Sequence, residues 1–332
     1  MSFKHRILLA SFIVLAAAAL LALPARLAAA TPETGDKPGS RLEYRFDNDA
    51  FGAPVVQASP SGARGISKLS VRLYGGFNWM AAGDVNKGAD GYFELFDLYT
   101  ALGPYTAEGG YRALHASYDF GGDVIYQITP RLGVGVGAGY LRGSRTSRMS
   151  ISEGTTTLLT VSGGPTLSAV PLRLGLFYNT PLSGKLDLVA GLGGDYYAAF
   201  KFESVTRLEY SPTEWNLMTY RGSSSSNLGF RGSLGLEYKL SPTMGVFVEA
   251  VGRYARFGNF DSITVAAETE AGPGEPVEAK LYLMTATFMG EKITIFQPLQ
   301  TAPPPDTAET SFIQPKFDLS GFSLQAGVRI RF

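Results

Sequence analysis

The chain has 332 residues, no cysteine and 29 basic against 29 acidic side chains, so its formal charge is zero. The lack of cysteine excludes a disulfide scaffold and thiol chemistry, and the balanced charge offers no basic field for nucleic acid. Glycine is abundant at 40 residues, charged residues make up only 17% of the chain, and no run of about 18 apolar residues follows the N-terminal segment. We therefore expect any membrane span to consist of strands, which lipid tolerates only as a closed barrel.

The N-terminal residues resemble a secretory signal peptide. A basic stretch, Lys4 to Arg6, precedes the apolar run Ile7–Leu23, and Ala28–Ala30 provides small residues for a signal peptidase. We predict a signal peptide over 1–30 that is cleaved after Ala30; an uncleaved anchor helix is the alternative. Residues 31–65 are predicted to form a periplasmic segment that is either disordered or tucked into the barrel mouth.

Residues 66–332 contain eight segments in which apolar and polar side chains alternate, each long enough for the ~9–11 residues of a tilted transmembrane strand. These segments are Lys68–Trp79, Leu114–Ile128, Arg131–Tyr140, Val170–Tyr178, Lys185–Lys201, Asn227–Leu240, Met244–Tyr254 and Phe322–Phe332. Pro171 cannot donate a ladder hydrogen bond, so a bulge is expected there. The pattern predicts an all-β fold, namely a transmembrane antiparallel up-and-down β-barrel of eight strands, with polar side chains in the lumen and apolar ones toward lipid.

The connections between these segments fall into two classes. Short turns contain Thr129-Pro130, Thr180-Pro181 and Ser241-Pro242, whereas the long connections cover about 80–111, 143–168, 203–226 and 258–315. This asymmetry is typical of periplasmic turns and extracellular loops. Within the last loop, Lys280–Phe296 is expected to form a hairpin; as two further barrel strands it would give ten.

Outward-facing aromatic side chains are predicted near both ends of the strands, where they would form the two interfacial girdles of a membrane barrel. The expected members are Tyr126, Tyr178, Tyr238 and Phe332 at one end, and Trp79, Tyr140, Phe200 and Tyr254 at the other.

Charged residues at inward positions form the candidate site. They are Arg72, Asp119, Asp123, Arg173, Asp187, Asp195, Arg231, Glu237, Glu249, Arg253 and Arg329. Buried charges are costly unless they are paired, so a salt-bridged polar core is expected, with Arg72–Asp123 as the first candidate pair. A gated pore in which the pairs exchange partners is the alternative. The inward glycine row at 133, 135, 137 and 139 is expected to make room for large opposing side chains, or else to leave a ligand slot.

No residues suggest a cofactor, a metal site or an enzyme. His115-Ala116-Ser117 resembles the His-x-Ser of lipid A deacylases, but alternation turns His115 and Ser117 inward, away from lipid. Carboxylates lack the spacing of a metal loop, and the glycine row is not a phosphate loop. The first long loop is rich in aromatic residues, which suit either a contact surface or packing among the loops.

The signal peptide, the hairpin turns and the terminal Gly327–Phe332 segment together resemble the small eight-stranded outer-membrane barrels, the group that holds the OmpA membrane domain, OmpX and OmpW. The resemblance implies location in the bacterial outer membrane, contact with lipid and lipopolysaccharide, a monomeric state, and recognition of Phe332 by the barrel-assembly machinery. Small-barrel folds host many functions. We expect a non-enzymatic structural or surface-interaction role, with passage of a small or apolar solute, as in OmpW-like proteins, and lipid A modification as the alternatives.

Overall fold

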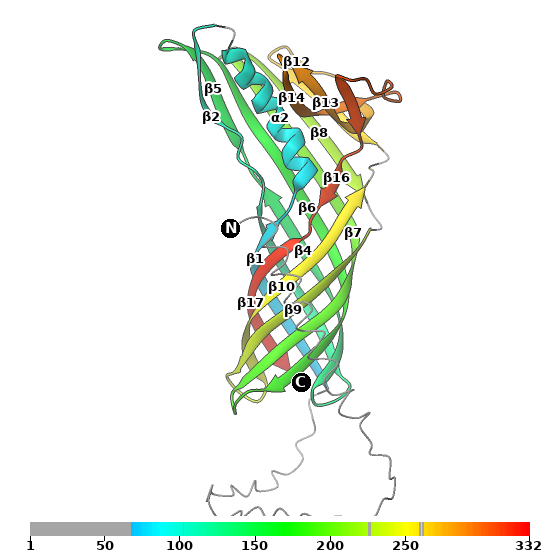
Figure 1. The fold of residues 1–332 in the computed structure, drawn as a ribbon. Helices are drawn as coiled ribbons and strands as arrows, with labels where there is room; N and C mark the ends of the chain where they lie inside the picture. Colours follow the sequence, from blue (N-terminus) through cyan, green and yellow to red (C-terminus); the bar gives the residue numbers. More distant parts are fainter. Residues whose placement is uncertain (1–67, 102, 225–226, 259, 261) are drawn as a thin grey trace, which may run out of the picture.

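The computed structural model describes residues 68–332, except 102, 225–226, 259 and 261 (Figure 1). The predicted signal peptide at 1–30 and the predicted periplasmic segment at 31–65 lie outside the described residues.

One set of strands closes on itself. In order of pairing, these strands are β1 (Leu69–Met80), β3 (Ala116–Gln127), β4 (Leu132–Ser144), β6 (Thr156–Pro181), β7 (Leu186–Ser211), β9 (Asn227–Lys239), β10 (Met244–Gly258) and β17 (Gly321–Arg331). Every pair is antiparallel, and β17 pairs with β1 to complete the ring. We call this closed sheet the ring.

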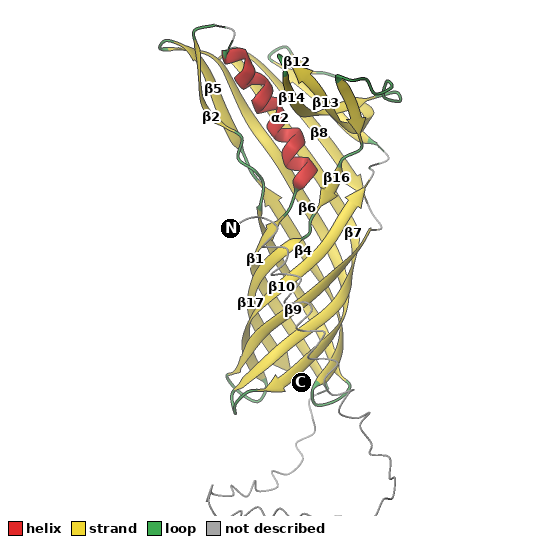
Figure 2. Ribbon diagram, viewed as in Figure 1, coloured by secondary structure: helices red, strands yellow, loops and turns green. Residues whose placement is uncertain are grey.

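The remaining elements form a second region at one end of the ring, which we call the head (Figure 2). They are α2 (Gly83–Thr100), β2 (Tyr105–Gly110), β5 (Ser147–Glu153), β8 (Glu214–Ser224), β11 (Ile263–Thr269), β12 (Gly272–Pro273), β13 (Val277–Phe288), β14 (Glu291–Leu299), β15 (Thr310–Ile313) and β16 (Lys316–Asp318). The described residues therefore hold 17 strands, more than the eight alternating segments of the sequence, because the long connections are themselves folded.

Two long strands join the ring to the head. β6 and β7 each contain 26 residues, far more than the ~9–11 that cross a bilayer, and their distal halves pair with β5 and β8. The sheet continues from β8 to β11 and β13. The segment Lys280–Phe296 lies in the hairpin β13–β14, which also pairs with β15 and takes no part in the ring.

The faces of the ring differ in polarity as alternation predicts. On β6, Leu172, Leu174 and Leu176 are 44, 62 and 44% exposed, whereas Arg173 between them is only 6% exposed. An exposed apolar face around a buried polar interior is the arrangement of a membrane barrel, the inverse of a soluble sandwich.

The prediction that Phe200 faces outward is wrong, because β7 contains a bulge. The β6–β7 register shifts from Val170↔Ala199 to Pro171↔Tyr197, which leaves Ala198 as an extra residue. The sequence predicted an irregularity at Pro171, but the extra residue lies on the partner strand and reverses its faces beyond that point. Phe200 is consequently fully buried, whereas Tyr196, on the near side of the bulge, is 42% exposed.

Helix α2 lies in the first long connection, where the sequence predicts an extracellular loop. Val85, Ala89 and Phe93 recur at helical spacing and are all buried on the side that packs against the head strands. No helix in the described part of the chain is long and apolar enough to cross a membrane.

Candidate functional site

Nearly all the charged residues predicted for the lumen are buried inside the ring. Arg72, Asp119, Asp123, Arg173, Asp187, Asp195, Glu237, Glu249, Arg253 and Arg329 are each at most 8% exposed, and the Arg231 side chain is 12% exposed. They form three groups at different depths along the ring, described here from the head end downward.

The group nearest the head is centred on Asp119. Its carboxylate accepts hydrogen bonds from Arg253 Nη2 at 2.7 Å, Gln325 Nε2 at 2.9 Å and Arg173 Nη2 at 3.2 Å. Arg173 Nε also lies 3.9 Å from Asp195 Oδ1. These residues come from strands on different sides of the ring, so the hydrogen bonds cross the lumen. Gln325, a neutral side chain on the polar face of the last strand, was not among the predicted site residues, all of which are charged.

The middle group contains Arg72 and Glu249. Arg72 Nη2 lies 2.8 Å from Glu249 Oε2, and its guanidinium carbon lies 4.0 Å from the centre of the Phe247 ring. The candidate pair Arg72–Asp123 is therefore corrected. These two residues are direct cross-strand neighbours, yet the arginine reaches over β17 to the carboxylate of β10. Arg231 Nη2 lies 4.0 Å from the other oxygen of Glu249.

The third group closes the end with the short turns. Glu237 pairs with Arg329 at 2.9 Å and also contacts Arg331, while Lys239 Nζ lies 2.6 Å from Asp187 Oδ1. Arg331 was not among the predicted site residues, although its place on the polar face of the last strand was evident from the sequence. The C-terminal Phe332 is 66% exposed, and its backbone N–H donates to the Leu69 carbonyl at 2.9 Å.

The inward glycines at 133–139 leave no empty slot. A Cβ at Gly135 would lie 2.7 Å from the Phe177 ring, and one at Gly139 would lie 2.5 Å from Arg173 Nη2. Both distances are too short for a real contact. The absent side chains thus make room for Phe177 and Arg173, which fill this side of the lumen.

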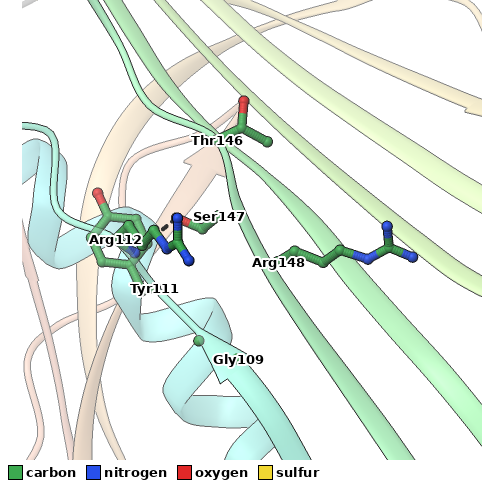
Figure 3. A pocket seen from close by; sticks show the side chains of 7 residues that line it. Gly109, Tyr111, Arg112, Thr146, Ser147 and Arg148 are labelled. Carbon is green, nitrogen blue, oxygen red and sulfur yellow. Dashed lines mark hydrogen bonds between the residues drawn. The ribbon is translucent and has the colours of Figure 1, made fainter.

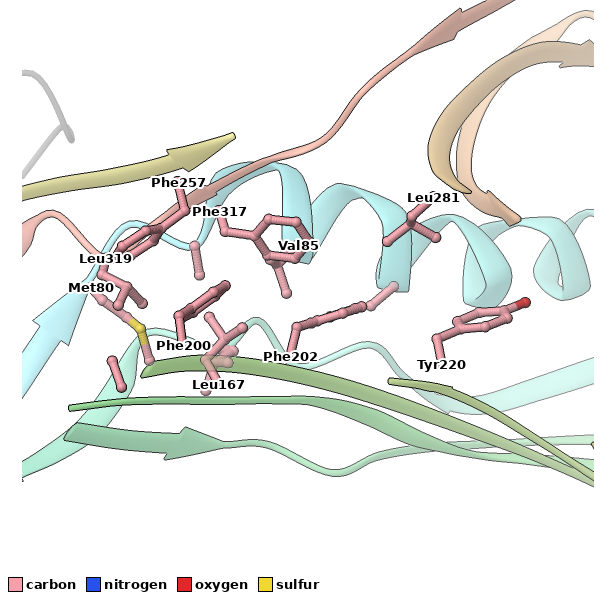
Figure 4. Packing of buried hydrophobic residues seen from close by; sticks show 14 of the residues in the cluster. Met80, Val85, Leu167, Phe200, Phe202, Tyr220, Phe257, Leu281, Phe317 and Leu319 are labelled. Atoms are coloured by element: carbon pink, nitrogen blue, oxygen red, sulfur yellow. The ribbon is translucent and has the colours of Figure 1, made fainter. Parts of the chain in front are cut away.

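Above the charged groups, an apolar cluster lies between α2 and the long strands (Figure 4). The Phe200 ring stacks on Phe257 with centroids 4.5 Å apart, and Phe202 lies 4.9 Å from Phe317. Val85 of α2 is fully buried in the same cluster. The cluster joins residues of α2, β6, β7, β10 and β16, so it fills the head directly beyond the ring.

Tyrosine hydroxyls hydrogen-bond α2 to its neighbours in the head. Tyr92 donates to the Phe296 carbonyl at 2.6 Å, and its oxygen lies 2.9 Å from the Tyr220 hydroxyl. Burial raises the pKa of Tyr92, and the nearby Tyr220 hydroxyl raises it further. Tyr111 donates to Asn86 Oδ1 at 2.8 Å near the start of the helix. These aromatic residues of the first long connection, Tyr92 and Tyr111, therefore hydrogen-bond within the head.

The His115–Ser117 pair has no catalytic geometry. Ser117 is buried and its hydroxyl is engaged by Asn78, whose Nδ2 donates to Ser117 Oγ at 2.7 Å. His115 Nδ1 lies 3.2 Å from the Met80 carbonyl oxygen instead. Among the described residues, no group of three or more histidine, cysteine or carboxylate side chains is arranged to hold a metal.

One surface pocket with basic walls lies on the head (Figure 3). Its volume is 440 Å³, and its lining consists of Gly109, Gly110, Tyr111, Arg112, Thr146, Ser147 and Arg148. Ser147 Oγ accepts a hydrogen bond from the Arg112 backbone N–H at 2.8 Å. This bond ties the segment at Arg112 to β5 beside the pocket. Both arginines are exposed.

Comparison with known proteins identifies a family. The model of the family described as "Outer membrane protein beta-barrel domain" matches residues 51–270. Two solved structures are among those that the chain matches. The outer membrane protein OprG from Pseudomonas aeruginosa is 11% identical, with a TM-score of 0.30, and the match covers 79% of this chain and 95% of that one. The outer membrane protease OmpT from Escherichia coli is 9% identical, with a TM-score of 0.30, covering 80% and 96%. No curated protein matches the sequence.

Proposed function

Because the chain belongs to the family of outer membrane protein beta-barrel domains, we propose that the ring is a bacterial outer-membrane barrel of eight strands with the head outside the cell. The exposed apolar face of the ring supports this placement. The short turns at one end and the folded connections at the other support the orientation, with Thr129-Pro130 and its counterparts in the periplasm.

The proposed role is structural and surface-interacting, without open passage through the lumen. The observation that supports it is that side chains of two different kinds fill the path through the ring, one after the other. Ion pairs such as Arg72–Glu249 occupy the lumen, and the apolar cluster around Phe200 occupies its outer mouth. Eight strands enclose just enough room for side chains, so these fillings leave the ordered head as the surface available to partners.

Catalysis is not part of the proposal. A hydrolase dyad requires the base within hydrogen-bond reach of the nucleophile, whereas His115 and Ser117 each engage other groups. We propose no cofactor, a monomeric barrel, contact with lipid and lipopolysaccharide, and a role for Phe332 in recognition by the assembly machinery.

Single-channel conductance of the refolded mature protein in a planar bilayer tests the closed lumen. Wild type and Arg72→Ala should both be silent, because removing one side chain leaves the Asp119 group and the apolar cluster in place. Reproducible openings of the wild type that change with Arg72→Ala would instead favour the alternative, passage of a small solute through exchanging ion pairs.

Single introduced cysteines test the orientation cleanly, because the chain has none of its own. Thr155→Cys lies in the β5–β6 turn of the head, and Ser183→Cys lies in a short turn of the ring. On intact cells, a membrane-impermeant maleimide should label only Thr155→Cys. Labelling of Ser183→Cys alone would reverse the proposed orientation.

A further inference from the structure

The outer wall of the long strands changes from apolar to polar along one row of paired residues. On the ring side of this row, the nearest exposed side chains are apolar or aromatic, among them Phe120, Tyr140 and Leu172 at 55, 43 and 44% exposure. The next row contains, directly opposite one another on successive strands, Tyr118, Arg142, Ser168, Lys201 and Ser223. This is the first polar row beyond the apolar band.

The two cations of this row lack acidic partners. Farther out on the same wall, Glu203 is held by Arg221 at 2.9 Å, and Glu209 is held by Arg207 at 2.7 Å. Arg142 and Lys201 are exposed, and neither has a carboxylate within ion-pair distance among the residues that the structure describes.

The row has the dimensions of an anion site. Neighbouring strands are about 4.8 Å apart, so the backbones of Arg142 and Lys201 are about 10 Å apart across β6. Both side chains are long enough to converge on one anion above the Ser168 hydroxyl, which lies directly between them. Arginine offers a planar fork that matches phosphate, and lysine adds a compact charge.

We infer that Arg142, Ser168 and Lys201 bind a phosphate group of a lipid headgroup in the outer leaflet. A headgroup meets the row where the apolar band ends, and its lipid part can contact Tyr118 and Tyr140, which a free phosphate cannot do. The basic pocket continues the path outward, since Arg148 pairs with Ser162, six residues before Ser168 on β6. The inference rests on the proposed placement of the head outside the cell.

Retention of diphosphoryl lipid A by the refolded protein in detergent, followed by native mass spectrometry, tests the inference. The variant Arg142→Gln/Lys201→Gln should retain roughly tenfold less lipid than wild type, because two charge-assisted contacts are lost. The matched control Arg131→Gln/Lys185→Gln removes the same charges from exposed positions at the opposite rim and should bind like wild type. Inorganic phosphate at millimolar concentration should not compete.

Equal retention by the two double variants, or equal retention of dephosphorylated lipid A by wild type, would overturn the inference. Competition by inorganic phosphate would assign the row to the free anion instead of a lipid. Cysteine labelling of Thr155→Cys and Ser183→Cys distinguishes a wrong orientation of the barrel from a wrong lipid site, because it reports on orientation without any lipid added. Heat-modifiable migration in gels verifies that every variant has folded.

Discussion

Replacing Asp119 by asparagine should destabilise the barrel more than any exposed charge substitution. The carboxylate accepts from Arg253, Gln325 and Arg173, and its side chain is 0% exposed. An amide of the same shape keeps at most part of the hydrogen bonding and none of the charge. Arg253 then loses its ion pair, whereas Arg173 keeps Asp195 at 3.9 Å.

The size of the effect follows from this difference. Removal of one partner from a buried pair costs about 3–5 kcal/mol, and the remaining contact of Arg173 places Asp119→Asn at the lower end, about 3 kcal/mol. The matched control is Glu203→Gln. It breaks a pair whose side chains are 40 and 67% exposed, and pairs of this kind contribute at most about 1 kcal/mol.

Urea unfolding of the refolded protein in detergent measures both variants. With a slope of about 2–3 kcal/mol per molar urea, Asp119→Asn should lower the midpoint by about 1 M or more. The double variant Asp119→Asn/Arg253→Gln should recover part of the lost stability, since it also removes the unpaired charge of Arg253. A midpoint for Asp119→Asn no lower than that of Glu203→Gln would refute the reasoning.

Three further predictions concern the head and the C-terminus. Phe200→Ala should cost about 3–5 kcal/mol locally and speed amide exchange in α2 while sparing β3 and β4, because it empties the centre of the apolar cluster; uniform exchange changes would contradict this. Burial raises the pKa of Asp90 above its ordinary 3.8, so the folded head takes up a proton more readily than the unfolded chain and loses stability as pH rises past about 4. Exchange in 83–100 should therefore be slower at pH 4 than at pH 7 after correction for the intrinsic rate. Asp90→Asn should reduce this difference without abolishing it, because burial also raises the pKa of Glu94 on the same helix. Phe332→Ala should leave the free energy of unfolding within about 0.5 kcal/mol of wild type, because Phe332 is 66% exposed, yet reduce the folded fraction recovered from cells; equal yields would remove the assembly role.

Sequence periodicity predicted most of the ring but little of the head. Alternation identifies the two faces of strands such as β6 because the side-chain period of a strand is two. It cannot identify α2, whose apolar residues recur at helical spacing only over a short stretch that is also rich in glycine and charge. The helical periodicity of α2 rests on only three apolar residues, Val85, Ala89 and Phe93. The contact between Tyr92 and Tyr220 cannot be read from periodicity at all, because it depends on β8 pairing with β7.

Ion-pair partners were the least predictable part of the candidate site. Register correctly places Asp123 opposite Arg72, but a long side chain in a narrow lumen is not confined to its neighbour. Arg72 reaches Glu249 and lies over the Phe247 ring, two strands away around the closed sheet. Only three-dimensional closure decides which charges meet, so a sequence can predict that a lumen is charged and balanced without predicting its pairs.

The extra residue on β7 links the membrane face to the head. With strict alternation beyond Tyr196, Phe200 and Phe202 would face outward and Lys201 would face inward among the rings of Phe257 and Phe317. Ala198 reverses this arrangement in one step, since a shift of one residue exchanges the faces of a strand. The same bulge therefore sends the phenylalanines into the apolar cluster and Lys201 outward onto the polar row that also contains Arg142. A change in β7 that removed the bulge would have to disrupt both the apolar cluster and the polar row with Arg142 and Lys201, because neither can form on this strand without the other.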